Sequence, residues 1–151
     1  MQTIKVTIKD IAVFTLSDKI YARLKFDKSF TANVRVGEQN VQQEVDYIDY
    51  SREHLMHLVC GIVPEINILA NHRKELAVGD SAKRFTIANL GIYLIGATLT
   101  IDRTPFAKDS TYVDYNGETK VHTHDGFSKE IVAIELTERG ERRLDNALAN
   151  I

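Results

Sequence analysis

Two histidines that could share one metal ion lie close together in the last third of the chain, His122 and His124. Side chains at positions i and i+2 of a β-strand point to the same face, so both imidazoles could bind a single zinc ion. Such a site would make the chain a metal-dependent enzyme. The alternative is a polar pair on an exposed hairpin. We expect this second arrangement, with no metal and no cofactor.

A second group of ligand-like side chains, His54, His57 and Cys60, follows helical spacing. Neighbours on a helix surface are three or four residues apart, so His54 and Cys60 fall on different parts of its circumference. We interpret Cys60 as a structural residue. The sequence also lacks a Gly-x-Ser-x-Gly elbow, a P-loop and a Gly-x-Gly-x-x-Gly loop. These observations favour a protein that is not an enzyme.

Interleaved aromatic and basic side chains form the pattern on which we place most weight. Aromatic rings that stack on bases and Lys or Arg side chains that neutralise phosphates are how proteins hold single-stranded nucleic acid. Tyr21, Arg23 and Lys25 alternate along one expected strand and would share its solvent face. The aromatic residues would stack bases and the basic residues would contact phosphates. The full predicted site comprises Tyr21, Arg23, Lys25, Arg84, Arg103, Phe106, Lys108, Tyr112, Tyr115 and Lys120.

The same side chains could instead be structural, as cross-strand aromatic pairs and ordinary solvent-facing cations. The net charge of the 151-residue chain is −2, from 19 Lys and Arg against 21 Asp and Glu. Residues 1–36 carry seven basic and three acidic residues, whereas residues 37–57 carry five acidic residues and one Arg. The basic first third could form one face of a nucleic-acid site. A few stacking and phosphate contacts suffice, so the small negative net charge does not exclude binding.

The first third of the chain has the pattern of β-strands. Apolar residues at every second position predict strands over 4–8, 21–26 and 30–36, and Ser17-Asp18-Lys19 is typical of a turn. Three such strands in succession indicate an antiparallel meander with one solvent face. Residues 41–50 fit a helix and a strand equally well.

The middle of the chain changes to helical spacing. Ser51 is a suitable N-cap and Pro64 suits a first helical turn, so we expect one or two helices within 51–77. Strand character returns over 84–101, where Gly96 suggests a bulge or a sharp bend.

A hairpin is the clearest local prediction. Asn116-Gly117 joins two β-like runs, and both residue types accept positive φ. Few residues of the hairpin are apolar, so we expect an arm that projects from the body. A strand over 129–136 and a final helix capped by Thr137 complete the chain.

These elements predict one domain over 1–151, of the α+β class and mainly β. Three strands, an intervening helix and two strands with an extended loop fit a single antiparallel OB-like barrel, and a sandwich is the alternative. The first residues do not have the pattern of a secretion signal. The longest uncharged stretch, residues 85–101, is shorter than a typical membrane span and contains polar residues. We expect a soluble, cytoplasmic protein without membrane contact.

The segment 135–144, Glu-Leu-Thr-Glu-Arg-Gly-Glu-Arg-Arg-Leu, resembles the end of winged-helix transcription regulators. The resemblance implies binding to duplex DNA, with the preceding hairpin as the wing. It requires a recognition helix upstream of the wing, where we expect a strand over 84–101.

We therefore predict a non-catalytic protein that binds single-stranded DNA or RNA. A homo-oligomer is also expected, because so polar an arm has little reason to fold against its own core. An alternative from a different functional class is a pure interaction module, in which the hairpin arm exchanges between copies of the chain.

Overall fold

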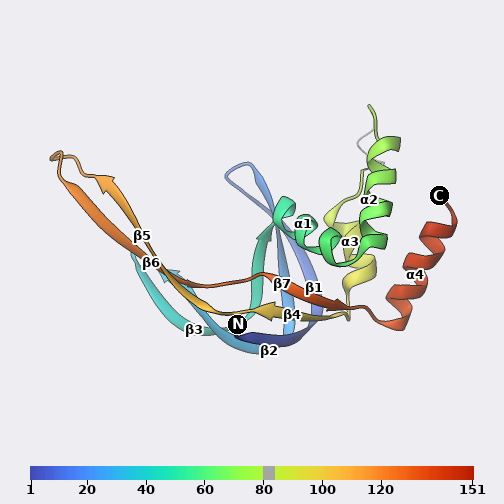
Figure 1. Ribbon diagram of the computed structural model, residues 1–151, viewed down its shortest axis with the longest axis horizontal. Coiled ribbons are helices and arrows are strands. Elements are labelled where there is room, and N and C mark those ends of the chain that lie inside the picture. Colours follow the sequence, from blue (N-terminus) through green and yellow to red (C-terminus); the bar gives the residue numbers. More distant parts are fainter. Residues whose placement is uncertain (80–83) are drawn as a thin grey trace.

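The computed structural model describes residues 1–79 and 84–151, with the side chains of Arg35, Thr123 and His124 left aside. Within these residues, three strands come first, followed by three helices, four strands and a last helix, and the helices gather on one side of the molecule (Figure 1). The elements are β1 (Thr3–Leu16), β2 (Lys19–Val36), β3 (Gln39–Ser51), α1 (Arg52–Ile62), α2 (Pro64–Leu76), α3 (Ile87–Leu94), β4 (Thr98–Asp102), β5 (Pro105–Val113), β6 (Thr119–Phe127), β7 (Ile131–Glu135) and α4 (Glu138–Ala149).

Five strands form one antiparallel sheet in the order β3-β2-β1-β4-β7, and β5 pairs only with β6. Strand β1 joins the two halves of the sheet. Its first residues pair with β4, and the residues after an irregularity between Ile8 and Asp10 pair with β2. This architecture confirms an α+β protein that is mainly strand.

The meander is confirmed, but its strands are divided differently from the prediction. Residues 21–26 and 30–36 belong to one strand, β2, which is interrupted by a register shift between Lys25 and Phe30. No Gly or Pro lies there to turn the chain, and the Asp27 carboxylate accepts a hydrogen bond from the Thr7 N–H at 2.8 Å. The third strand is therefore β3, which contains the ambiguous segment 41–50.

One or two helices were expected within 51–77, and the structure has two, α1 and α2. The Ser51 hydroxyl accepts a hydrogen bond from the His54 N–H, and Pro64 is the first residue of α2. The final helix is confirmed as well, because the Thr137 hydroxyl accepts a hydrogen bond from the Gly140 N–H at 2.9 Å.

The strand expected over 84–101 is largely wrong, because α3 occupies residues 87–94. Thr86 and Asn89 form a reciprocal capping box that satisfies the N–H groups at the start of this helix. Ile87, Leu90 and Leu94 are buried, so packing against the core overrides the β preference of the segment. Gly96 lies outside the strand; its φ of +87° redirects the chain from α3 into β4.

The sheet does not close into a barrel, which corrects the barrel prediction. Strands β3 and β7 are its two edges, and no strand pairing joins them in the described part of the chain. The chain turns into α1 directly after β3, and α1 packs against β7. The core lies between the sheet and the helices, with Leu24, Phe26 and Tyr50 among its fully buried side chains.

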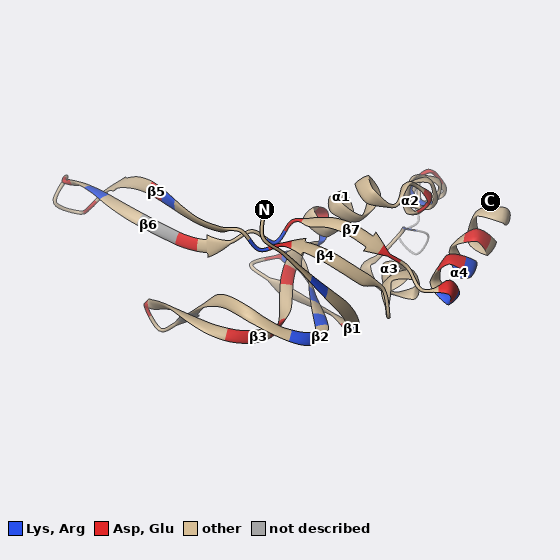
Figure 2. Cartoon of the chain, turned by 60° about the horizontal axis from the view of Figure 1, so that its bottom comes forward, with Lys and Arg blue, Asp and Glu red and all other residues tan. Residues whose placement is uncertain are grey.

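The predicted arm is present as the hairpin β5–β6, residues 105–127, and every residue of β5 is exposed. It extends away from the helices on the same side as the outer half of the β2–β3 hairpin (Figure 2). Its turn differs from the expected two-residue loop. The Asp114 carboxylate accepts hydrogen bonds from the Asn116 and Glu118 N–H groups, and only Gly117 has a positive φ. Among the described helices, none is long and apolar enough to cross a membrane.

Candidate functional site

The ten predicted site residues fall in three separate places. Three lie on the outer face of β2, six lie on the arm or at its base, and one lies among the helices. The outer face of β2 carries Tyr21, Arg23 and Lys25; the arm and its base carry Arg103, Phe106, Lys108, Tyr112, Tyr115 and Lys120; the helical side carries Arg84.

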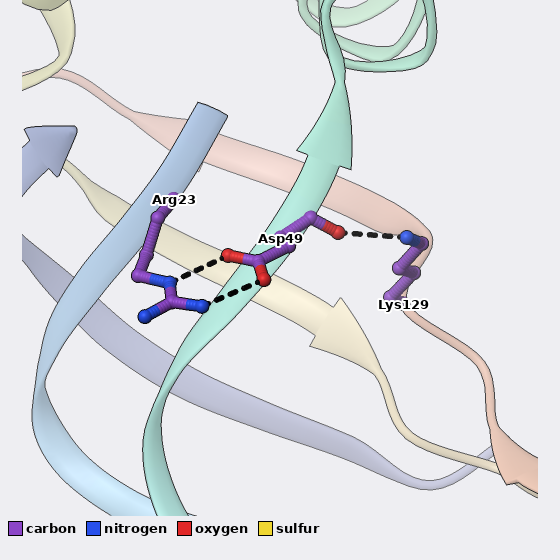
Figure 3. Close-up of polar contacts among 3 residues, drawn as sticks. All are labelled: Arg23, Asp49 and Lys129. Carbon is purple, nitrogen blue, oxygen red and sulfur yellow. Dashed lines mark hydrogen bonds and ion pairs between the residues drawn. The ribbon is translucent and has the colours of Figure 1, made fainter. Parts of the chain in front are cut away.

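On the outer face of β2, Arg23 is held by its own neighbours. Its Nε and Nη2 donate to the two carboxylate oxygens of Asp49 on β3, at 2.8 and 3.0 Å (Figure 3). The guanidinium lies over the ring of Tyr47 at 4.1 Å, and the ring of Tyr21 stacks on Phe14 at 5.5 Å. The hydrogen bond that Arg23 donates to the Asp49 carboxylate raises the pKa of Arg23. In this part of the predicted site, Arg23 and Tyr21 already contact neighbouring residues, so they have fewer groups left to bind a ligand.

On the arm, strand register places four predicted residues on one face. Phe106, Lys108 and Tyr112 alternate along β5, and Tyr112 pairs directly with Lys120 on β6. We call these four residues the aromatic–basic face of the arm. Tyr112 is 52% exposed and Phe106 50%, and Tyr115 at the tip is 97% exposed. These rings are accessible for stacking.

Two local contacts on the arm involve residues of its aromatic–basic face. The Lys120 ammonium lies 3.1 Å from the Glu118 carboxylate, and both side chains are largely exposed. Ion pairs of this kind contribute little to stability, so Lys120 can exchange its partner readily. Phe106 covers Gly126 across the arm, where a Cβ atom would meet the ring at 2.8 Å. Gly126 therefore leaves room for the ring of Phe106, the first residue of the aromatic–basic face.

Arg103 lies at the base of the arm and not on its surface. Its Nη1 donates to the Ser128 carbonyl at 3.0 Å and its Nη2 to the Thr31 carbonyl at 3.1 Å. The guanidinium carbon lies 5.0 Å from the ring centre of Phe30 and 5.2 Å from that of Phe127. Burial lowers its pKa. Arg103 therefore connects the arm to β2.

Lys129 was missed by the sequence analysis, although it lies beside Arg103 in the same site. Its Nζ donates to the Asp49 carbonyl at 2.7 Å, as Figure 3 shows, and lies over the Tyr50 ring at 5.1 Å. The Tyr50 hydroxyl donates in turn to the Lys129 carbonyl at 2.6 Å. Burial lowers the pKa of Lys129 and raises that of Tyr50. No local pattern distinguishes this lysine, because its partners lie about 80 residues earlier in the chain.

A groove of about 470 Å³ lies between the β2–β3 hairpin and the base of the arm. Such a volume is in the range of ligand-binding clefts. The Asn33 side chain donates to the Asp125 carbonyl at 2.9 Å and joins the two walls. The lining combines aromatic, basic and acidic groups and includes Phe30, Tyr47, Asp49, Arg103, Phe127 and Lys129.

Arg84 is not brought together with the rest of the predicted site. It lines a second cavity, of about 950 Å³, with residues of α1 and α2 such as Arg52 and Lys74. Cys60 lines the same cavity, and burial raises the pKa of its thiol. A raised pKa disfavours the thiolate, so Cys60 is poorly suited to act as a nucleophile.

Two alternatives can be compared with the structure. His122 lies on β6 opposite Ser110, and the side chain of His124 is outside the described residues. Among the described side chains, no group of three or more His, Cys, Asp or Glu is placed to hold a metal ion. Helix α3 occupies the position that a recognition helix would need, but half of its residues are buried and it carries no charged side chain.

Comparisons with protein-family models, curated proteins and solved structures found no match to this chain.

Proposed function

We propose that this protein binds single-stranded DNA or RNA on the arm and in the groove between the base of the arm and the β2–β3 hairpin. The lining of this groove supports the proposal, because it combines aromatic rings with the cations Arg103 and Lys129. Bases would stack on the exposed rings of Phe106, Tyr112 and Tyr115, and Lys108 and Lys120 would contact phosphates.

The connectivity of the sheet supports an open, OB-like arrangement, which is part of the same proposal. An OB-fold binds oligonucleotides on the face of its second and third strands and on the loops after its first and fourth strands. In this chain three meander strands precede the helices, and the arm is inserted between β4 and β7. The arm therefore occupies the connection that would carry ligand contacts in such a fold.

The test is fluorescence anisotropy with labelled oligo-dT, oligo-U and duplex DNA over a salt series. We expect salt-dependent binding to the single strands and weaker binding to the duplex, because only unpaired bases can stack on the arm. Tyr112→Ala should weaken binding, whereas Thr111→Ala, on the opposite face of the same strand, should not. Flat titrations with all three nucleic acids would refute the proposal, and binding to the duplex alone would favour the winged-helix alternative.

A second candidate function is a non-catalytic interaction module. Val113 and Val121 are exposed on the face of the arm opposite Tyr112, where a second copy of the chain could cover them. This candidate predicts that deletion of residues 111–122 converts an oligomer into a monomer, measured as mass in solution. A mass unchanged by the deletion would contradict it.

A further inference from the structure

Two cations at the floor of the groove have no carboxylate among their hydrogen-bond acceptors in the described part of the chain. Arg103 donates to the carbonyls of Thr31 and Ser128, and Lys129 donates to the carbonyl of Asp49. Neutral carbonyls orient these groups without cancelling their charge. Each side chain retains charge that an anion in the groove could meet.

The acidic groups near the floor cancel only part of this charge, although the Asp49 carboxylate acts electrostatically on Lys129. The Asp49 carboxylate is already bound by Arg23 through both of its oxygens. Asp125, which also lines the groove, is exposed. Arg23, Arg103 and Lys129 against these two carboxylates leave one positive charge in excess. Because burial disfavours the charged form of Arg103 and Lys129, an anion placed between them would be stabilised more than at the surface.

The position of the two cations is also informative. Arg103 lies between β4 and β5 and Lys129 between β6 and β7, so they mark the two legs of the arm. Arg103 joins its leg to β2 at Thr31, and Lys129 joins the other leg to β3 at Asp49. An anion held by both would tie the arm to the β2–β3 hairpin from both sides.

We propose that the floor of the groove is a phosphate-binding site, in which Arg103 and Lys129 hold one backbone phosphate of a bound nucleic-acid strand. This inference rests on the proposed function for the source of the phosphate, but not for the site itself. A planar guanidinium and a compact ammonium together are well suited to phosphate oxygens. Bases on either side of this phosphate would lie against the arm and the β2–β3 face.

The first experiment compares Lys129→Gln with Lys9→Gln in oligo-dT binding over a salt series. Glutamine keeps a donor that can bond to the Asp49 carbonyl but removes the charge. We expect Lys129→Gln to weaken binding on the order of tenfold and to lower the salt slope by about 0.7, the value for one phosphate on a single strand. Lys9→Gln, which changes an exposed lysine of β1 outside the predicted site, should change both much less. Equal effects of the two variants would overturn the site.

The second experiment uses the wild-type chain and inorganic phosphate at constant ionic strength, followed by amide NMR signals. Phosphate should shift the signals of Arg103 and Lys129 and leave that of Tyr112 unchanged. If phosphate shifts these signals but no oligonucleotide binds, the site stands and the proposed function fails. If oligonucleotides bind but neither phosphate nor Lys129→Gln has an effect, the function stands and the site is refuted. If phosphate and oligonucleotides both leave the protein unchanged, both proposals fail.

Discussion

The outer face of β2 and the aromatic–basic face of the arm have the same sequence pattern and different structures. On β2 these side chains make contacts within the protein: Arg23 binds Asp49, and Tyr21 stacks on Phe14. On the arm, Phe106 and Tyr112 remain about half exposed. Strand β2 has a neighbour on each side, whereas β5 has only β6. Alternating aromatic and basic residues therefore keep accessible rings where the strand lacks a second neighbouring strand.

The largest effect should come from the contact that fixes the two regions relative to each other. Arg103→Met removes two hydrogen bonds and the interaction with two rings, and leaves the carbonyls of Thr31 and Ser128 without this donor. We expect the free energy of unfolding to fall by about 2 kcal/mol. Urea unfolding measures this change. Lys108→Met, on the exposed strand of the arm, is the control and should change stability by less than about 0.5 kcal/mol. An equal loss in both variants would mean that Arg103 does not brace the arm.

The next variant, Asp49→Asn, is designed to make Arg23 on the outer face of β2 more accessible. Asp49→Asn removes the charged partner of Arg23, so stability should fall by about 1 kcal/mol in urea unfolding, a modest loss because both side chains are partly exposed. Arg23 would then be available to phosphate, and affinity for oligo-dT should rise. Asp46→Asn removes an exposed carboxylate of the same strand as a control. A stable Asp49→Asn protein with unchanged affinity would show that the cluster does not restrain Arg23.

Local patterns predicted much of this fold, and long-range contacts account for what they missed. Ser51, Pro64 and Thr137 act within one helical turn, so the ends that they mark were predicted correctly. Helix α3 was missed because burial of Ile87 and Leu90 against distant elements outweighs the strand preference of the Ile and Tyr residues in this segment.

The candidate site was predicted in the same uneven way. The sequence analysis listed Phe106, Lys108 and Tyr112 as site residues without assigning them to one face, and the strand register places them on one face of β5. Burial of Arg103 between Phe30 and Phe127 depends on segments far apart in the chain, and so does the contact of Lys129 with Asp49. The position of Arg84 among the helices likewise depends on how the chain packs after α2.

A smaller effect, limited to acid pH, is expected where the arm leaves the sheet. Hydrogen bonds from the Thr104 hydroxyl and N–H lower the pKa of Asp102 below its ordinary value of 3.8. A depressed folded-state pKa means that this carboxylate stabilises the fold above its unfolded pKa. The contribution is lost as pH falls through the folded value. Asp102→Asn should therefore reduce the decline in stability between about pH 5 and pH 2, measured by urea unfolding at each pH. An identical pH profile would show that these hydrogen bonds do not matter.

The smallest effect on stability is expected for Lys120→Gln. Its ion pair with Glu118 is exposed, so unfolding should change by less than about 0.5 kcal/mol. The same variant should lower the salt slope of oligonucleotide binding, because Lys120 lies on the aromatic–basic face. A clear loss of stability would show that Lys120, like Arg23 on β2, is held by contacts within the protein.

The most direct measurement compares Tyr112→Ala with Tyr21→Ala in titrations of labelled oligo-dT. One ring is half exposed on the arm, and the other is already stacked on Phe14. Loss of one stacked base costs about 1–3 kcal/mol, so Tyr112→Ala should weaken binding by about tenfold or more. Tyr21→Ala should weaken it by less than about threefold. A larger loss for Tyr21→Ala, or no loss for Tyr112→Ala, would contradict the assignment of binding to the arm.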